Sequence, residues 1–416
     1  MRICLLSYRS YRYSGGQGIY LRYLSRSLRD LSHQVDVISG PPYPELDEGI
    51  KLIKLPSLDL YTMSSLQRLL LNPRKLNTFP NLVEWLGNIS GYFSEPLAFG
   101  MRAHALLRNS TGNKYDIVHD NQTMAYGVLK IQELGLPVVE TIHHPAIIDR
   151  DLAIESTTSL KDKLGIKRWY SFIDMQIKVA RKLSHIITVS ETAHQHIAKT
   201  FGISENKMRV IYNGIDTDIF SPSPKINRME NRLLVIISRD TAVKGLKYML
   251  EALAILRQKH DLELTVIAKG TDNSTTQNLI SALGIKDHVN FIDEIDTAEL
   301  VKQYRLAGIV VVPSIYEGFG LPAAEAMACG APIVSTTAGA LPEVVADAGI
   351  LVPPADSTAL SEAISALVVS PNKRKNLCKM GRKRIVQMFS WQNTAKHTAD
   401  VYAEAIAYQK HLNRAG

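Results

Sequence analysis

The sequence has no long hydrophobic run and few cysteines, and both absences restrict what the protein can be. No uninterrupted apolar segment of the 416 residues approaches the ~20 that a transmembrane helix needs. The apolar stretch after Met1 is too short for a secretory signal and lacks a small-residue cleavage site, so we interpret it as a first strand. Cys4, Cys329 and Cys378 are unevenly spaced, which predicts neither a disulfide framework nor a metal cluster. We therefore expect a cytoplasmic protein.

A strong excess of either charge is also missing. The formal net charge is +8 and the pI about 9.2, but the basic residues are scattered and do not interleave with aromatic residues. We therefore predict no nucleic-acid partner. Anionic small molecules or an acidic membrane surface account for the charge at least as well. With 45% apolar and 21% charged residues, the chain is long enough for two folded domains.

Short apolar runs alternate with longer segments of helical period, which is typical of parallel α/β layers. The runs are 2–7, 34–39, 117–119, 138–142, 185–189, 233–238, 263–267, 289–291, 309–313 and 332–335. They form two series without a close sequence repeat. The pattern therefore predicts an α/β fold with two doubly wound domains.

A cluster of turn formers and prolines at 213–232 marks the boundary between these domains. We expect an N-terminal domain at 1–212 and a C-terminal domain at 213–390. The segment 390–411 has a helical period, and we predict that a final helix at about 391–416 crosses back to the N-terminal domain.

Residues 56–110 place leucines beside basic residues, for example Leu66, Leu69 and Leu70 beside Arg68 and Lys75. Two interpretations stay open. The helices pack on their own sheet, or they lie on an anionic lipid surface as a peripheral membrane contact. In either case we expect this region to contribute to the choice of acceptor.

Two loops that follow predicted strands are suited to binding an anion, one through its glycines and the other through two cations. Gly15 and Gly16 precede a helix whose start offers free N–H groups to an anion, and the spacing predicts one buried stripe on that helix. The stripe consists of Leu21, Leu24, Leu28 and Leu31.

Arg239 and Lys244 follow the first strand of the second domain, where open α/β sheets bind ligands, and two cations there suit a diphosphate.

Residues 316–330 read Y-E-G-F-G-L-P-A-A-E-A-M-A-C-G and carry two carboxylates, Glu317 and Glu325. The pattern predicts a buried strand, a loop holding Glu317, and a short helix with Pro322 in its first turn and Gly330 after its end. Glu325 then lies about one turn into the helix. Between the two glutamates, a row of backbone N–H groups can face a ligand. They belong to Gly318, Phe319, Gly320 and Leu321.

Several linked motifs resemble the retaining GT-B glycosyltransferases of family 4, the glycosyl transferases group 1. They are E-G-F-G-L-P-A-A-E, A-M-A-C-G-A-P-I-V-S-T, G-A-L-P-E-V-V, V-I-Y-N-G-I-D-T-D-I-F, R-x-x-x-x-K-G and the paired glycines near the start. The resemblance is strong over 185–390 and weaker over 40–135. It implies two Rossmann-like domains facing across a cleft.

The resemblance also implies a role for each matching residue. Glu325 would hold the ribose hydroxyls of a nucleotide-sugar, and Glu317 would face the donor sugar. Arg239 and Lys244 would stabilise the leaving diphosphate, and the loop of Gly15 and Gly16 would cover it. The family's histidine near the donor sugar aligns with His143, although His144 is adjacent. By this resemblance, the catalytic residues would be Glu317, His143, Arg239 and Lys244.

The resemblance implies transfer of a sugar from a nucleotide-sugar, with retention, to a saccharide, lipid-linked or small-molecule acceptor. We expect no cofactor and no metal, and we interpret Asp216-Thr217-Asp218 as a structural turn because a hard cation needs more oxygen ligands. A nucleotide-sugar hydrolase or epimerase of the same fold is the alternative enzyme. A non-enzymatic nucleotide-sugar-binding protein is the alternative from another class. The sugar, the base and the oligomeric state are not predicted.

Overall fold

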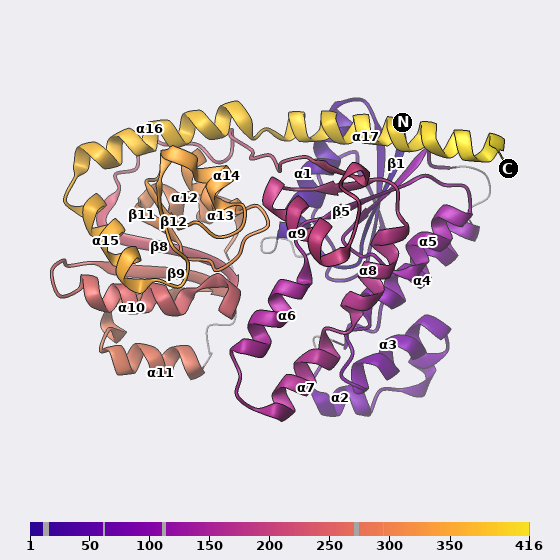
Figure 1. Ribbon diagram of the computed structural model, residues 1–416, viewed down its shortest axis with the longest axis horizontal. Coiled ribbons are helices and arrows are strands. Elements are labelled where there is room, and N and C mark those ends of the chain that lie inside the picture. Colours follow the sequence, from indigo (N-terminus) through magenta and orange to yellow (C-terminus); the bar gives the residue numbers. More distant parts are fainter. Residues whose placement is uncertain (11–15, 61–62, 110–113, 270–273, 294, 416) are drawn as a thin grey trace. The chain divides into compact units, whose positions relative to one another are not determined.

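The computed structural model describes residues 1–10, 16–60, 63–109, 114–269, 274–293 and 295–415 (Figure 1). The chain divides into two compact units. Unit 1 comprises Met1–Val189, Ala193–Ile211 and Gln392–Gly416, and unit 2 comprises Ser190–Thr192 and Tyr212–Trp391. Each unit has its own parallel sheet and its own hydrophobic core.

The sheet of unit 1 has seven strands in the order β3-β2-β1-β4-β5-β6-β7, and each neighbouring pair is parallel. The strands are β1 (Arg2–Ser7), β2 (Gln34–Ser39), β3 (Lys51–Lys54), β4 (Ile117–Asn121), β5 (Val138–Ile142), β6 (Ile186–Thr188) and β7 (Met208–Val210). The sequence predicts the five inner strands and misses the two edge strands. β3 and β7 are only partly buried, so they carry no continuous apolar run.

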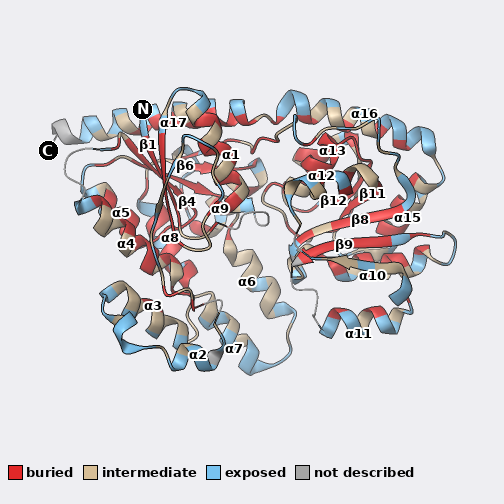
Figure 2. Ribbon diagram, turned by 180° about the vertical axis from the view of Figure 1, so that it is seen from behind, coloured by how far each residue is buried: buried red, intermediate tan, exposed pale blue. Residues whose placement is uncertain are grey.

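Helices cover the sheet of unit 1 and bury its central strands, which Figure 2 shows in red. They are α1 (Gly16–Asp30), α2 (Ser65–Leu69), η2 (Pro73–Leu76), α3 (Phe79–Ile89), α4 (Glu95–Asn109), α5 (Tyr126–Glu133), α6 (Ala146–Glu155), α7 (Leu160–Trp169), α8 (Phe172–Lys182), α9 (Glu191–Phe201) and η3 (Glu205–Lys207). The predicted stripe of α1 is buried at Leu21, Leu24 and Leu28 but wrong at Leu31, which is 40% exposed. The helix ends at Asp30, so Leu31 no longer follows its period.

The last helix, α17 (Trp391–Ala415), belongs to unit 1 from Gln392 onward. Its Tyr402 is fully buried and hydrogen-bonds to Nδ1 of His119 in β4 (2.6 Å). The other ring nitrogen of His119 bonds to Thr141 Oγ1 in β5 (2.6 Å). Burial lowers the pKa of His119 to about 3, so the ring is neutral at pH 7. A residue near the end of the chain therefore completes the core of the first sheet.

The sheet of unit 2 has six strands in the order β10-β9-β8-β11-β12-β13, again with parallel neighbours. The strands are β8 (Met229–Arg239), β9 (Glu263–Lys269), β10 (Val289–Ile292), β11 (Ala307–Val312), β12 (Ile333–Thr336) and β13 (Ile350–Val352). The sequence predicts all except the edge strand β13. The prediction of parallel α/β sheets is confirmed.

The helical segments of unit 2 alternate with its strands. They are η4 (Ala242–Lys244), α10 (Leu246–Leu256), α11 (Ser274–Leu283), η5 (Lys286–His288), α12 (Thr297–Leu306), α13 (Leu321–Ala328), α14 (Leu341–Val345), η6 (Ala346–Ala348), α15 (Ser357–Val368) and α16 (Pro371–Met388). As predicted, Pro322 lies in the first turn of α13 and Gly330 follows its end with φ 67°. Asp216 caps a turn, where its Oδ1 accepts the N–H groups of Asp218 and Ile219 (both 3.2 Å). No helix in the described part of the chain combines the length and the apolar character that a membrane crossing requires.

Candidate functional site

The central strand β11 of unit 2 ends in the loop that carries Glu317. All six residues of β11 are buried, so the strand is a fixed support for the loop. The loop after β8 packs directly against it, because Ile315 N donates to the carbonyl of Val243 (2.7 Å). Gly245 permits this approach, since a β-carbon there would collide with the carbonyl of Pro313. Two loops from neighbouring strands therefore meet at the carboxyl edge of the sheet, where open α/β folds bind ligands.

Lys244 and Glu317 form an ion pair at this edge. Lys244 Nζ lies 2.8 Å from Glu317 Oε1, and the two side chains are 24% and 11% exposed. Ser314 Oγ donates to the same oxygen, also over 2.8 Å. The backbone of Glu317 is held as well, because its carbonyl accepts the N–H of Ala340 (2.9 Å). The loop thus presents a positioned cation and a carboxylate with two donors on one oxygen.

The glycine-rich loop leads from Glu317 into α13. The Phe319 ring is buried and packs against Tyr212 and Phe389, so only its backbone is left to face a ligand. Within the described residues, no acceptor takes the N–H groups of Gly318, Phe319, Gly320 or Leu321. Helix starts with such free donors favour anions. This arrangement agrees with the row of backbone N–H groups that the sequence predicts, and ligand binding by these groups remains a prediction.

Glu325 lies inside α13 and is buried. Its Oε2 accepts a hydrogen bond from the hydroxyl of Tyr304 in α12 (2.8 Å). Burial raises the pKa of Glu325 to about 7, while the Tyr304 hydrogen bond opposes part of that rise. Near neutral pH this carboxyl therefore changes between a charged and an uncharged form.

Two of the predicted residues, Gly15 and Arg239, are described only in part or not at all. Gly15 lies outside the described residues, and Gly16 is the first residue of α1. The backbone of Arg239 ends β8 and pairs with Lys269, but its side chain is not among those described. Their predicted contacts with a donor stay predictions.

The predicted histidine, His143, lies in unit 1 just after β5. Its Nε2 hydrogen-bonds to Oδ1 of Asn121 (2.7 Å), and its backbone N–H donates to Oε1 of Gln122 (2.7 Å). Tyr20 packs edge-on against the ring at 4.7 Å between centroids. Burial lowers the pKa of His143 to about 3, so it is neutral at pH 7. Its neighbour His144 is instead paired with Asp149 (2.7 Å).

A buried pair of carboxyl groups supports this histidine. Asp120 in β4 and Glu140 in β5 lie opposite each other in the sheet, and both side chains are buried. Two buried carboxylates side by side repel each other, which favours a proton on one of them. Burial and the adjacent Asp120 raise the pKa of Glu140 well above its usual value.

The same carboxyl groups hold a strained loop. Glu140 Oε1 accepts the N–H of Gln122 (3.0 Å), and Asp120 Oδ2 accepts the N–H of Met124 (2.8 Å). Gln122 and Met124 both have positive φ values, 59° and 47°, which non-glycine residues adopt only when their surroundings enforce them. Because Gln122 in turn binds His143, the buried pair fixes the position of the predicted histidine.

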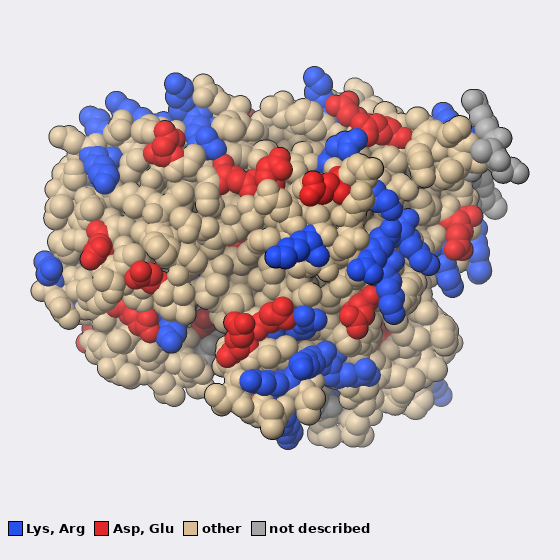
Figure 3. Space-filling model, viewed as in Figure 1, with Lys and Arg blue, Asp and Glu red and all other residues tan. Residues whose placement is uncertain are grey.

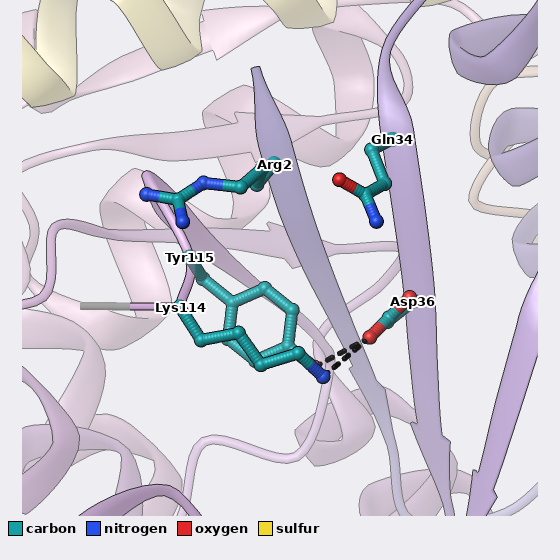
Figure 4. A pocket seen from close by; sticks show the side chains of 5 residues that line it. All are labelled: Arg2, Gln34, Asp36, Lys114 and Tyr115. Carbon is teal, nitrogen blue, oxygen red and sulfur yellow. Dashed lines mark hydrogen bonds and ion pairs between the residues drawn. The ribbon is translucent and has the colours of Figure 1, made fainter. Parts of the chain in front are cut away.

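A small pocket of about 230 Å³ lies elsewhere in unit 1 (Figure 4). It is lined by Arg2, Gln34, Asp36, Lys114 and Tyr115. Lys114 and Tyr115 both bind the carboxylate of Asp36 (2.9 and 2.7 Å). These residues stand at or near the amino ends of β1, β2 and β4, opposite the edge where such sheets bind ligands, so we assign the pocket no part in the chemistry.

Sequence reasoning missed several residues that support the site. Ser314 stands three residues before Glu317 in the loop, and the polar run Asp120-Asn121-Gln122 at the end of a buried strand was a usable signal. Tyr304 gave no signal, because it reaches Glu325 from another helix, 21 residues earlier in the chain.

Two parallel α/β units, one with a cation, two glutamates and a helix start at its carboxyl edge, agree with the GT-B glycosyltransferase architecture that the sequence motifs imply. The family descriptions that match are Glycosyl transferases group 1 over residues 218–384 and Glycosyltransferase Family 4 over residues 14–219. The chain is 42% identical over 411 residues to an MMP alpha-(1->4)-mannosyltransferase of Mycolicibacterium hassiacum, covering 98% of this chain and 99% of that protein. The chain belongs to the group 1 family of GT-B glycosyltransferases.

Solved structures show the same fold. Sucrose-phosphate synthase from Thermosynechococcus elongatus matches with a TM-score of 0.76 at 22% identity, covering 98% of this chain and 100% of that one. Anabaena HepE in complex with UDP-glucose matches with a TM-score of 0.70 at 17% identity, covering 97% and 100%. The predicted fold class and family are confirmed, and the protein is a glycosyltransferase.

Proposed function

We propose that the protein transfers mannose from a nucleotide-diphosphate sugar to a saccharide acceptor and forms an α-(1→4) linkage. The observation that supports this most is the 42% identity to an MMP alpha-(1->4)-mannosyltransferase over nearly the whole of both chains. The complex of HepE with UDP-glucose supports a nucleotide-sugar as donor. If the donor is an α-linked nucleotide-mannose, an α product means that the configuration is retained.

The unit 2 site offers what this reaction needs. When the bond between the sugar and the diphosphate breaks, negative charge develops on the leaving phosphate, and fixed donors around it favour the transition state. Lys244, held by Glu317, is such a donor, and the N–H groups before α13 are others. Arg239 joins them in this proposal, on the strength of the family motif alone.

In this proposal Glu317 positions groups and does not attack the sugar. One of its oxygens already accepts hydrogen bonds from Lys244 and Ser314, which lowers its nucleophilicity. The acceptor hydroxyl would then attack from the face of the leaving phosphate, which takes the proton. Glu325 would hold the ribose, and neutral His143 would hydrogen-bond to the donor sugar. No metal or cofactor takes part, and the reaction is cytoplasmic.

A nucleotide-sugar hydrolase or epimerase of the same fold is the competing function. The purified protein should be incubated with UDP-, GDP-, ADP- and dTDP-linked hexoses, with and without an α-mannoside acceptor, and the products separated by mass spectrometry. Acceptor-dependent growth by one hexose, with an α-anomeric signal in the NMR spectrum, is the expected result. Release of free sugar at the same rate without the acceptor would favour the hydrolase instead.

A further inference from the structure

Helix α3 carries its apolar side chains on the outside. In α3, whose residues are all described, the buried residue is Glu84, which is 1% exposed. The large apolar residues Phe79, Leu82, Leu86 and Ile89 are exposed instead. A helix of a globular protein normally turns such a stripe towards the core. The inverted orientation means that the stripe of α3 does not stabilise the fold of unit 1.

Specific contacts hold α3 in this orientation. The Glu84 carboxylate pairs with Arg102 of α4, which is the kind of partner that a buried charge requires. Ser94 Oγ donates to the carbonyl of Glu84 (2.8 Å). On the other side, Trp85 Nε1 donates to the carbonyl of Arg68 in α2 (2.8 Å). The outward stripe is therefore part of a fixed arrangement.

Helices α2 and α7 extend the exposed apolar surface. Leu160 and Leu164 of α7 are 79% and 68% exposed and share one helix face because they stand four residues apart. Arg168 of α7 joins this helix to the end of α3 through the carbonyl and hydroxyl of Ser90 (3.1 and 2.9 Å). Figures 1 and 2 show α2, α3 and α7 together at the same end of unit 1. We call this surface the α2–α3–α7 face, and its exposed apolar residues are Leu66, Leu69, Leu70, Phe79, Leu82, Leu86, Ile89, Leu160 and Leu164.

Positive charge borders the α2–α3–α7 face. The acidic residues of α2, η2, α3 and α7 are Glu84, which is buried against Arg102, and Asp162. Basic side chains outnumber them, and Figure 3 shows such side chains gathered over α7. The basic residues are Arg68, Arg74, Lys75, Lys161, Lys163, Lys167 and Arg168. Apolar side chains next to exposed cations match the interface of an anionic bilayer.

We propose that the α2–α3–α7 face docks the protein on an anionic lipid surface. A bilayer with acidic headgroups can take up the leucines and pair with the cations at once. A second copy of the chain fits less well, because a two-fold contact would bring the same basic residues together. This proposal is independent of the sugar transferred, so it can fail while the proposed function stands.

Sedimentation with vesicles tests the proposal on the full chain. Vesicles of phosphatidylglycerol and phosphatidylcholine in equal amounts should carry down the protein, and phosphatidylcholine vesicles should carry down at least about tenfold less. Salt should weaken the binding, because it screens exposed charges. Equal binding to both vesicles, or none to either, would overturn the proposal.

Two variants and a control then test whether the α2–α3–α7 face is responsible. Leu160→Ser/Leu164→Ser and Lys161→Ala/Lys163→Ala/Lys167→Ala should each lower the partition coefficient about tenfold or more. Both change α7, where none of the residues is buried, so unchanged thermal unfolding is the check on folding. The control Lys373→Ala/Lys375→Ala/Lys379→Ala removes the same charge from exposed sites on α16 of unit 2 and should bind like the wild type.

Equal loss in the α16 control would mean that net charge alone drives the binding, which would contradict the proposal. A dimer in analytical ultracentrifugation that Leu160→Ser/Leu164→Ser converts to a monomer, without vesicle binding by the wild type, would show that a second copy covers this face. That result would also overturn the proposal.

Discussion

Raising the pH from about 6 to about 8 should strengthen the binding of a nucleotide-sugar about tenfold, because Glu325 titrates in that range. Burial raises the pKa of this carboxyl to about 7, and Tyr304 is the hydrogen-bond donor that partly offsets the rise. In the proposed function, the ionised form accepts the ribose hydroxyls. The apparent Kd then scales inversely with the fraction ionised, which is about one tenth at pH 6 and about nine tenths at pH 8.

Isothermal titration calorimetry at several pH values measures this dependence. A nucleotide-sugar is the suitable ligand because its diphosphate has no group that titrates in this range, whereas the terminal phosphate of a nucleoside diphosphate does. Tyr304→Phe removes the hydrogen bond that favours the carboxylate, and a bond to a charged group contributes about 1.5–3 kcal/mol. The midpoint should therefore move up by about one to two pH units.

The matched control is Glu325→Gln, which cannot titrate. Its binding should be weaker than that of the wild type at about pH 8 and independent of pH. Wild-type binding that stays flat between about pH 6 and 8, or a Glu325→Gln variant with the full pH dependence, would refute the assignment of the ribose to Glu325.

The same titration predicts a change in stability. The pKa of Glu325 is about 7 in the folded protein, above the ordinary value of 4.5 for a glutamate side chain. Because the pKa is higher in the folded protein, the protonated carboxyl stabilises the fold. This contribution to the free energy of unfolding is fully present below about pH 4.5 and is lost as the pH rises through about 7. The difference corresponds to about 3 kcal/mol. Glu325→Gln should thus gain stability relative to the wild type between about pH 5 and 8, measured by urea unfolding.

Further expectations concern the cations, the buried carboxyl pair and the absence of a metal. Lys244→Ala or Arg239→Ala should lower kcat about 100-fold or more with little change in thermal unfolding, and an unchanged kcat would contradict leaving-group stabilisation. Glu140→Gln should fold and react nearly as the wild type, because its amide can donate a hydrogen bond to Asp120. The double variant Asp120→Asn/Glu140→Gln places two donors face to face and should lower Tm markedly. Equal Tm values for the two variants would exclude a shared proton. Donor binding and transfer should persist in excess chelator, and their loss would overturn the metal-free assignment.

The fold class was predictable because buried parallel strands carry continuous apolar runs. β11, buried along its whole length, is clear in the sequence, while β3 at the sheet edge has only two partly buried residues between two exposed lysines, a pattern that a loop could also have. Leu31 shows the same limit at a helix end, where the period continues in the sequence after the helix has stopped at Asp30.

The site was predictable one residue at a time but not as a set of contacts. Lys244 and Glu317 were each placed after a strand, yet they are 73 residues apart, and they meet because β8 and β11 are neighbours in the sheet. Neither Asp120 nor Glu140 alone predicts a shared proton from the sequence, since that proton depends on the register between β4 and β5. Tertiary pairing of this kind is not encoded in local spacing.

The return of α17 to unit 1 has a consequence for how the protein is made. On the ribosome, the whole of unit 2 emerges before Tyr402, so unit 2 can complete its core while unit 1 still lacks the buried side chains of α17. During that interval His119 lacks the hydroxyl of Tyr402 as its hydrogen-bond partner, and the part of the core that buries Val401 and Ala405 remains exposed to water. The first domain to be started is therefore the last to be finished, and a chain truncated after Trp391 should carry a folded unit 2 and a protease-sensitive unit 1.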